Sequence, residues 1–117
     1  MVRTNGTFAT EIREKMRGGS GSVKVETLWA PGTDLKSKTR LCARLTLAPG
    51  SSIGYHDHIN EEEVYCIVSG QGFVTENGQQ LPVTAGDSIL TGNGEGHAIE
   101  ATGTEPLVIL ATIMLYA

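Results

Sequence analysis

The chain is poor in basic residues, in cysteine and in long apolar segments, and each shortage excludes a class of protein. Lys and Arg number nine against thirteen Asp and Glu, which gives a formal net charge of -4. An acidic balance of this kind argues against a partner that is bound through positive charge. We therefore expect neither nucleic acid nor an anionic membrane surface as a partner.

The two cysteines, Cys42 and Cys66, are too few for the framework of a small disulfide-stabilised protein. Each lies inside an apolar, strand-like run of residues. We expect reduced thiols that act as small core or interface residues, and a disulfide or reactive pair is the less favoured alternative.

The longest apolar stretch, PLVILATIMLYA at residues 106–117, is too short and too interrupted to span a bilayer. No basic-then-apolar leader opens the sequence, so we expect a soluble, cytoplasmic protein. A length of 117 residues fits one domain with one modest core.

Glycine, in contrast, is abundant, with 15 residues, and after residue 47 it separates short β-branched runs. This texture is typical of an all-β domain. Asn77-Gly78 favours a tight hairpin, because a type I′ turn needs positive φ at both central residues. Short antiparallel strands in this number fit a closed barrel or a jelly roll. The runs lie within residues 23–29, 40–49, 52–58, 63–70, 71–83, 87–92, 97–102 and 106–115.

Residues 1–22 are predicted to form an N-terminal arm ahead of a barrel at residues 23–117. Thr10 could cap a short helix over residues 11–17, which Gly18 would end. The Gly/Ser segment at residues 18–22 is predicted to be a flexible linker, since it lacks the Lys-Ser/Thr ending of a phosphate-binding loop.

Two of the three histidines are spaced as metal ligands. On a strand, His56 and His58 point to the same face, because side chains alternate with a period of two residues. If the glutamate-rich strand that follows is their hairpin partner, it places one carboxylate opposite the two imidazoles. Glu61 and Glu62 then fall in the turn, and Glu63 is the first glutamate of the returning strand.

His97 is the remaining histidine and would complete the set. Three imidazoles and one carboxylate suit Fe(II), Mn(II), Ni(II), Zn(II) or Cu(II). Such a set can leave coordination positions open for water or substrate, as catalytic sites do. The alternative is that a His-x-His pair lies beside glutamates by chance, on a solvated acidic turn.

Residues 50–70 resemble the first motif of the cupin superfamily. That motif runs Gly, five residues, His-x-His, three or four residues, Glu, six residues, Gly. The chain has Gly50, His56, His58, Glu63 and Gly70 at these positions. The spacing therefore selects Glu63 over its two neighbours.

Residues 86–101 resemble the second cupin motif in part. That motif runs Gly, five residues, Pro-x-Gly, two residues, His, three residues, Asn. Gly86, Gly94 and His97 match it, whereas Gly92 stands in place of Pro and Ala101 in place of Asn. Neither departure removes a metal ligand, because His97 is retained.

The resemblance covers roughly residues 40–112 and implies a double-stranded β-helix, the cupin jelly-roll barrel. It implies that His56, His58, Glu63 and His97 hold one divalent transition metal, Mn, Fe, Ni or Zn, inside the barrel near an open end. The chain is similar to small single-domain bacterial cupins of the oxalate-decarboxylase-like and mannose-6-phosphate-isomerase-like type. These suggest a homodimer, with exchange of the N-terminal strand as one form.

A metal held in this way would bind a small molecule that offers two oxygens, such as a hydroxy-, keto- or dicarboxylate or a sugar derivative. We expect an enzyme that carries out decarboxylation, isomerisation or dioxygenation. The alternative is a non-catalytic cupin that binds a sugar or carboxylate.

Three residues are candidates for a catalytic role beside the metal. Tyr65 should share the inward face of Glu63, Glu62 could transfer protons from the turn, and Arg44 could clamp a carboxylate. Arg40 should lie on the same face of its strand as Arg44. The structural alternatives are a core aromatic, a hydrated turn carboxylate and a solvated or interface arginine.

Overall fold

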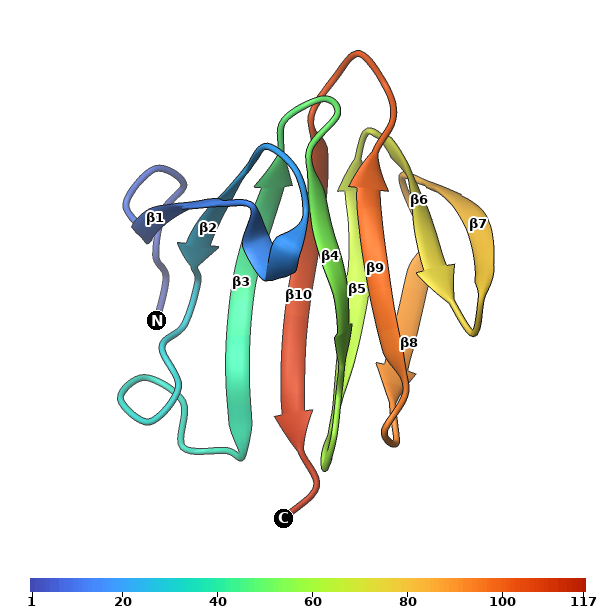
Figure 1. Cartoon of the computed structure of the whole chain (residues 1–117). Coiled ribbons are helices and arrows are strands. Elements are labelled where there is room, and N and C mark those ends of the chain that lie inside the picture. Colours follow the sequence, from blue (N-terminus) through green and yellow to red (C-terminus); the bar gives the residue numbers. More distant parts are fainter.

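The strands form two antiparallel sheets that pack face to face, as Figure 1 shows. The computed structural model describes residues 1–117. The first sheet has the strand order β1-β2-β3-β10-β5-β8, and the second has the order β4-β9-β6-β7. The elements are β1 (Ala9–Glu14), η1 (Met16–Gly18), β2 (Ser22–Thr27), β3 (Thr39–Leu47), β4 (Ser52–Asp57), β5 (Glu61–Ser69), β6 (Gln71–Glu76), β7 (Gln79–Thr84), β8 (Ser88–Gly92), β9 (Gly96–Ala101) and β10 (Leu107–Leu115).

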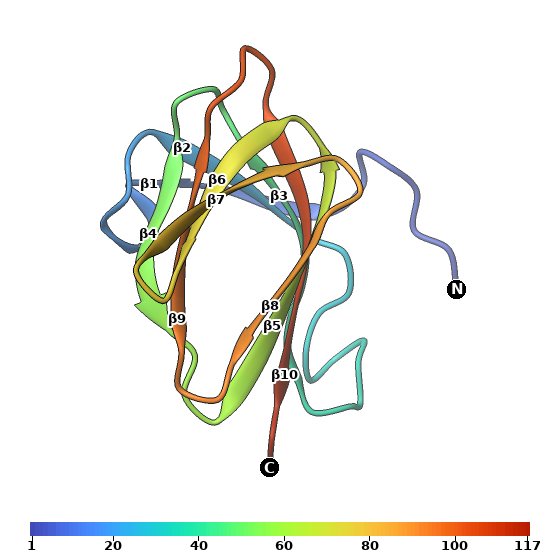
Figure 2. The ribbon, with the colours of Figure 1, turned by 90° about the vertical axis from the view of Figure 1, so that its right-hand side faces the viewer.

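One apolar core of 16 buried residues lies between the two sheets. It is built by alternation: in β10, Leu107, Ile109 and Ala111 are buried, while the residues between them are partly or fully exposed. The all-β prediction and the double-stranded β-helix are confirmed. The closed barrel is wrong, because no ladder joins the edges of the two sheets; β8 ends one and β7 ends the other (Figure 2).

The predicted tight hairpin is confirmed. Residues 71–83, predicted as one run, divide into β6 and β7, which pair on either side of Asn77-Gly78. Both central residues have positive φ, 50° at Asn77 and 73° at Gly78, as a type I′ turn requires.

The helix predicted over residues 11–17 is wrong. Its first residues belong to β1, which pairs with β2 over its full length, from Ala9 opposite Thr27 to Glu14 opposite Ser22. Lys15 and Arg17 then adopt left-handed backbone conformations, so only a single 3-10 turn forms. No helix of the structure is long and apolar enough to cross a membrane.

The Gly/Ser segment is packed against β4, in contrast to the flexible linker that was expected. The amide of Ser20 donates to the Ser52 hydroxyl at 2.9 Å, and the amide of Ser22 donates to the Ser51 hydroxyl at 3.1 Å. At Gly19 a Cβ atom would overlap the carbonyl oxygen of Ser52. Glycine is therefore needed here for close backbone approach rather than for flexibility.

Both cysteines are free thiols on the outer side of the first sheet. Cys42 is partly exposed and Cys66 is exposed, so neither belongs to the core. A core role for the thiols is therefore wrong. The reason is strand phase, because the neighbours of Cys66, Tyr65 and Ile67, take the inward positions of β5.

Candidate metal centre

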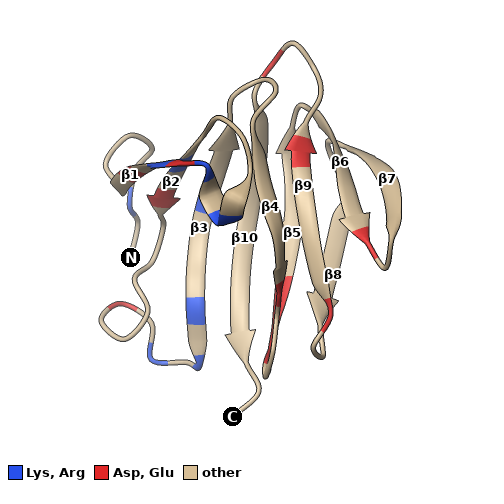
Figure 3. Cartoon of the chain, viewed as in Figure 1, with Lys and Arg blue, Asp and Glu red and all other residues tan.

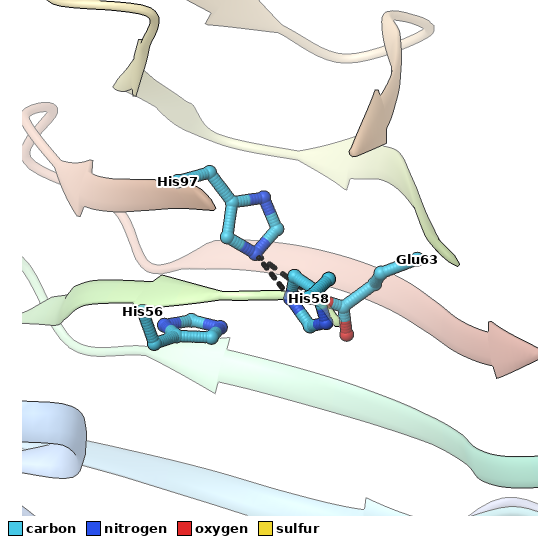
Figure 4. A group of neighbouring side chains, drawn as sticks. All are labelled: His56, His58, Glu63 and His97. Atoms are coloured by element: carbon cyan, nitrogen blue, oxygen red, sulfur yellow. Dashed lines mark hydrogen bonds and ion pairs between the residues drawn. The ribbon is translucent and has the colours of Figure 1, made fainter. Parts of the chain in front are cut away.

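The three histidines and Glu63 converge between the two sheets, as Figure 4 shows. His56 and His58 come from β4 and the residue after it, and His97 comes from β9, which is paired with β4. Glu63 comes from β5 in the other sheet. The predicted hairpin between the histidine strand and the glutamate strand is therefore wrong, since the chain crosses between sheets after His58 and Glu63 faces the imidazoles across the core.

An irregular step in β4 aims the histidines inward. Ile53 pairs with Ile99 and His56 with His97, so three steps along β4 match two along β9. This extra residue shifts the phase of the strand. Ile53 is fully buried in the core, and His56 points into the same space although strict alternation would separate them.

The Nδ1 atom of each imidazole faces a hydrogen-bond acceptor. His56 Nδ1 donates to the Gly54 carbonyl at 2.8 Å, and His97 Nδ1 lies 2.9 Å from the Thr91 hydroxyl oxygen. Since the Thr91 hydroxyl donates to Glu76, it accepts from His97. A backbone carbonyl and an ionised carboxylate can only accept hydrogen bonds. His58 Nδ1 is therefore the donor in its 2.5 Å hydrogen bond to Glu61. In the neutral imidazoles, all three Nε2 atoms are thereby left with lone pairs.

With all three imidazoles in the neutral form that binds metal, these lone pairs and one carboxylate oxygen face one another without a donor among them. His58 Nε2 lies 3.1 Å from His97 Nε2, and both lie 3.0 Å from Glu63 Oε1. Glu63 Oε1 is buried and has no hydrogen-bond partner. Four acceptors within 4.8 Å of one another are the arrangement that a cation requires, so the residues fit a divalent metal ion.

The environment also favours neutral imidazole at His56. Burial lowers the pKa of His56, and the hydrogen bond to the Gly54 carbonyl only partly opposes this; the neighbouring His97 and His58 lower it further. A neutral imidazole is the form that binds metal.

Glu61 is part of the centre rather than of a hydrated turn, which corrects the sequence prediction. It is the first residue of β5, is buried, and accepts from His58 and from Arg40. The Arg40 hydrogen bonds, against the opposing effect of burial and together with His58, lower the pKa of Glu61 to about 2. Glu61 is therefore a fixed anion behind His58.

The two arginines of β3 do not share a face, contrary to the alternation that was expected. The β3–β10 register shifts so that Ile113 pairs with Leu41 and Met114 with Thr39, which leaves Arg40 as the extra residue of a bulge. A bulge redirects the side chain of its extra residue. Arg40 therefore reaches Glu61.

Arg44 lies on the outer face of the first sheet, away from the metal cluster. It binds both carboxylate oxygens of Glu26, at 3.0 and 2.9 Å, and donates to Asn5. Its guanidinium also lies 5.4 Å from the centre of the Phe8 ring. Glu62 faces the same outer side, where it lines a surface hollow with Tyr116. Neither side chain is directed at the ligands.

Tyr65 lies inside, as alternation with Glu63 predicts. Its ring stacks on His97 with centroids 4.8 Å apart and an interplanar angle of 17°. Burial and, after it, the charge of Glu63 raise the pKa of Tyr65 well above its usual value. The phenol is therefore a protonated group beside the cluster.

Four functional side chains were missed or misplaced by sequence reasoning: Glu61, Arg40, Thr91 and Glu76. Thr91 could have been found, because it follows Ile89 at an inward position of its strand. Glu61 and Arg40 could not, because their meeting depends on a sheet crossover and a bulge.

Charge is divided unevenly along the chain, and Figure 3 shows the result. All nine basic residues precede residue 45, along with four of the thirteen acidic residues, so the remaining nine acidic residues follow it. β4 to β10, which carry all four clustered side chains, thus contain no Lys or Arg. This surplus of negative charge favours a cation at the cluster.

The fold and the cluster together define a class of protein: a two-sheet jelly roll with three histidines and one glutamate between its sheets, which could hold a metal ion. The chain belongs to the cupin family: the model of the family described as "Cupin domain" matches residues 43–113. This range includes all four cluster residues and confirms the resemblance found in the motifs.

A curated protein and a solved structure, both from Thermotoga maritima, are similar to this chain. The curated oxalate-binding protein of this bacterium is 42% identical over 115 residues, which are 98% of this chain and 94% of that protein. A crystal structure of a predicted oxalate decarboxylase from the same species superposes with a TM-score of 0.93, at 42% identity, covering 98% of this chain and 99% of that one. A cupin 2 conserved barrel domain protein from Salinispora arenicola, at 19% identity and a TM-score of 0.75, shares the fold.

Proposed function

We propose that the chain binds one divalent transition metal through His56, His58, Glu63 and His97 and uses it to bind oxalate or a closely similar small carboxylate. The observation that carries this proposal is the buried, unpartnered Glu63 Oε1 facing lone pairs of His58 and His97. The oxalate-binding relative from Thermotoga maritima supports the choice of ligand.

The ligand is expected to be drawn in chiefly by the metal. Arg44, Arg40, Arg13 and Arg3 are engaged in ion pairs, and the cluster lies in the acidic part of the chain. Arg17 is in no ion pair and its charge acts on Tyr65 beside the cluster, so it is the one arginine left to add positive charge there. Oxalate is a dianion that presents two oxygens to one cation. When bound, the metal would supply the positive charge and orient the two oxygens of the ligand.

Binding should therefore depend on metal. In isothermal titration calorimetry, oxalate is expected to release heat with Mn-loaded protein and none with chelator-treated protein. Formate, which has one carboxylate, serves as the control and should bind at least about 10-fold more weakly, a difference of about 1.4 kcal/mol. Equal binding of oxalate by metal-free protein, or failure of Mn, Fe, Ni and Zn to bind at all, would contradict the proposal.

Decarboxylation of the bound ligand is the enzymatic form of this function, and the similarity to the predicted oxalate decarboxylase from Thermotoga maritima supports it. Binding without turnover is the second candidate. It is favoured by the buried Tyr65, whose raised pKa makes it a weak proton donor. Release of formate and carbon dioxide by Mn-loaded protein would separate the two, and its absence with saturating oxalate leaves binding as the function.

We also propose that two copies form a homodimer through the outer face of the first sheet. Val68, Leu90 and Leu110 expose 49%, 64% and 39% of their surface there, on the neighbouring strands β5, β8 and β10. β1 is exposed along its whole length, which leaves it available to a second copy. Sedimentation equilibrium is expected to give twice the 12.4 kDa chain mass, and Leu110→Glu should lower it; a stable wild-type monomer at micromolar concentration would contradict this.

A further inference from the structure

Three side chains form a line from the protein surface to the metal cluster. Arg40 donates to both carboxylate oxygens of Glu61, at 2.9 and 2.8 Å, and His58 Nδ1 donates to the same carboxylate at 2.5 Å. The exposed fraction of the side chain falls from 44% at Arg40 to 10% at Glu61 and 1% at His58. Arg40, the exposed end of this line, is therefore linked to the cluster by hydrogen bonds through Glu61.

The partner behind His58 differs in kind from the partners behind the other two imidazoles. His56 donates to the carbonyl of Gly54 and His97 to the hydroxyl of Thr91, which are neutral groups. His58 alone donates to a carboxylate. A hydrogen bond to a charged acceptor is roughly twice as strong as one to a neutral acceptor. Such a partner fixes the tautomer of a histidine ligand and increases its basicity.

Arg40 determines where that carboxylate can lie. Its guanidinium binds the two oxygens of Glu61 as a fork, which allows one orientation of the carboxylate plane. The bulge in β3 is what brings Arg40 to this position, because regular pairing would send its side chain to the other face. The bulge thus places Arg40, Arg40 orients Glu61, and Glu61 orients His58.

We propose that Glu61 and Arg40 are positioning residues that hold His58 with Nε2 toward the metal, so that an exposed arginine helps to set the metal affinity. The proposal rests on the metal-binding function proposed above. It adds that the three histidines contribute unequally to metal affinity, and that the exposed Arg40 affects the contribution of His58.

Metal affinity is the first readout, measured by competition with a chromophoric chelator. Glu61→Gln keeps the shape of the side chain but loses its charge, and it is expected to weaken Mn binding by about 10- to 100-fold. Arg40→Met should weaken it in the same direction and by less. Glu26→Gln is the matched control, because Glu26 is a buried carboxylate held by an arginine fork on the same sheet with no contact to a histidine.

The control separates a positioning role from a general loss of stability. Glu26→Gln should leave the dissociation constant for Mn within twofold of wild type, even where it lowers the unfolding midpoint. If Glu61→Gln and Glu26→Gln bind Mn equally tightly, the proposal is overturned.

The second readout needs no metal and is nitrogen-15 NMR of the histidine side chains in chelator-treated protein. Wild type should show His58 as the Nδ1–H tautomer, and Arg40→Met should add a population of the Nε2–H tautomer. An unchanged His58 spectrum in both Arg40→Met and Glu61→Gln would refute the positioning role. Failure of wild type to bind metal would instead refute the proposed function, and the two results are therefore distinguishable.

Discussion

Replacing Glu63 by Gln is expected to destroy metal binding and, at the same time, to stabilise the metal-free protein. In chelator-treated wild type with neutral histidines, Glu63 Oε1 is a buried acceptor 3.0 Å from two further acceptors, the Nε2 atoms of His58 and His97. The amide of Gln supplies two N–H donors at this place. Satisfying the orphaned atoms should raise the unfolding free energy of the metal-free variant by about 1–3 kcal/mol.

Glu63→Gln should weaken metal binding more than the loss of a residue that only hydrogen-bonds a metal ligand, such as Glu61. Glu63 is the only anionic ligand of the four, so its neutralisation should weaken Mn binding by more than the roughly 100-fold upper range for such a hydrogen-bonding residue. Thermal unfolding with and without Mn measures both effects in one series. Saturating metal stabilises a protein in proportion to the logarithm of its concentration over the dissociation constant. Wild type should therefore gain stability on addition of Mn, and Glu63→Gln should not.

Glu100→Gln provides the control, because Glu100 is an exposed carboxylate of β9 and takes no part in the cluster. This variant should match wild type in both metal-free stability and the response to Mn. A metal-free Glu63→Gln protein that is less stable than wild type would show that the four side chains do not form a cation site.

The shared face of His56 and His58 and the inward position of Tyr65 could be predicted from sequence because they depend on local rules. His56 and His58 share a face by strand alternation, and Tyr65 shares the inward face of Glu63 for the same reason. The Asn77-Gly78 hairpin likewise follows from the φ values that two residues can adopt. Each of these inferences needs only neighbours in the chain.

The predictions that were wrong depend on pairing between distant strands. The crossover that puts Glu63 opposite the histidines is set by which strands share a sheet, and the ion pair of Arg40 with Glu61 requires a bulge against β10. The expected helix at residues 11–17 failed because pairing with β2 overrides a weak local preference. No periodicity within a single segment carries this information.

The second large effect is expected at Gly54, where the N-terminal arm meets the metal cluster. A Cβ atom at Gly54 would overlap the carbonyl oxygen of Arg17 and lie 2.9 Å from the amide nitrogen of Gly19. Both obstacles are backbone atoms in a turn that packs against β4, so neither can rotate away (Figure 1). Gly54→Ala should therefore destabilise the protein by about 1–3 kcal/mol, as overpacking does elsewhere.

The same substitution should weaken metal binding, because the Gly54 carbonyl accepts the Nδ1–H of His56 at 2.8 Å and orients its ring. Urea unfolding of metal-free protein and chelator competition measure the two effects separately. Gly103→Ala is the matched control: its nearest neighbours would lie 3.8 Å away and its φ is not in the left-handed region, so its stability should stay within about 0.5 kcal/mol of wild type. Equal unfolding midpoints for the two variants would mean that the arm yields at Gly54, and that β4 holds His56 without it.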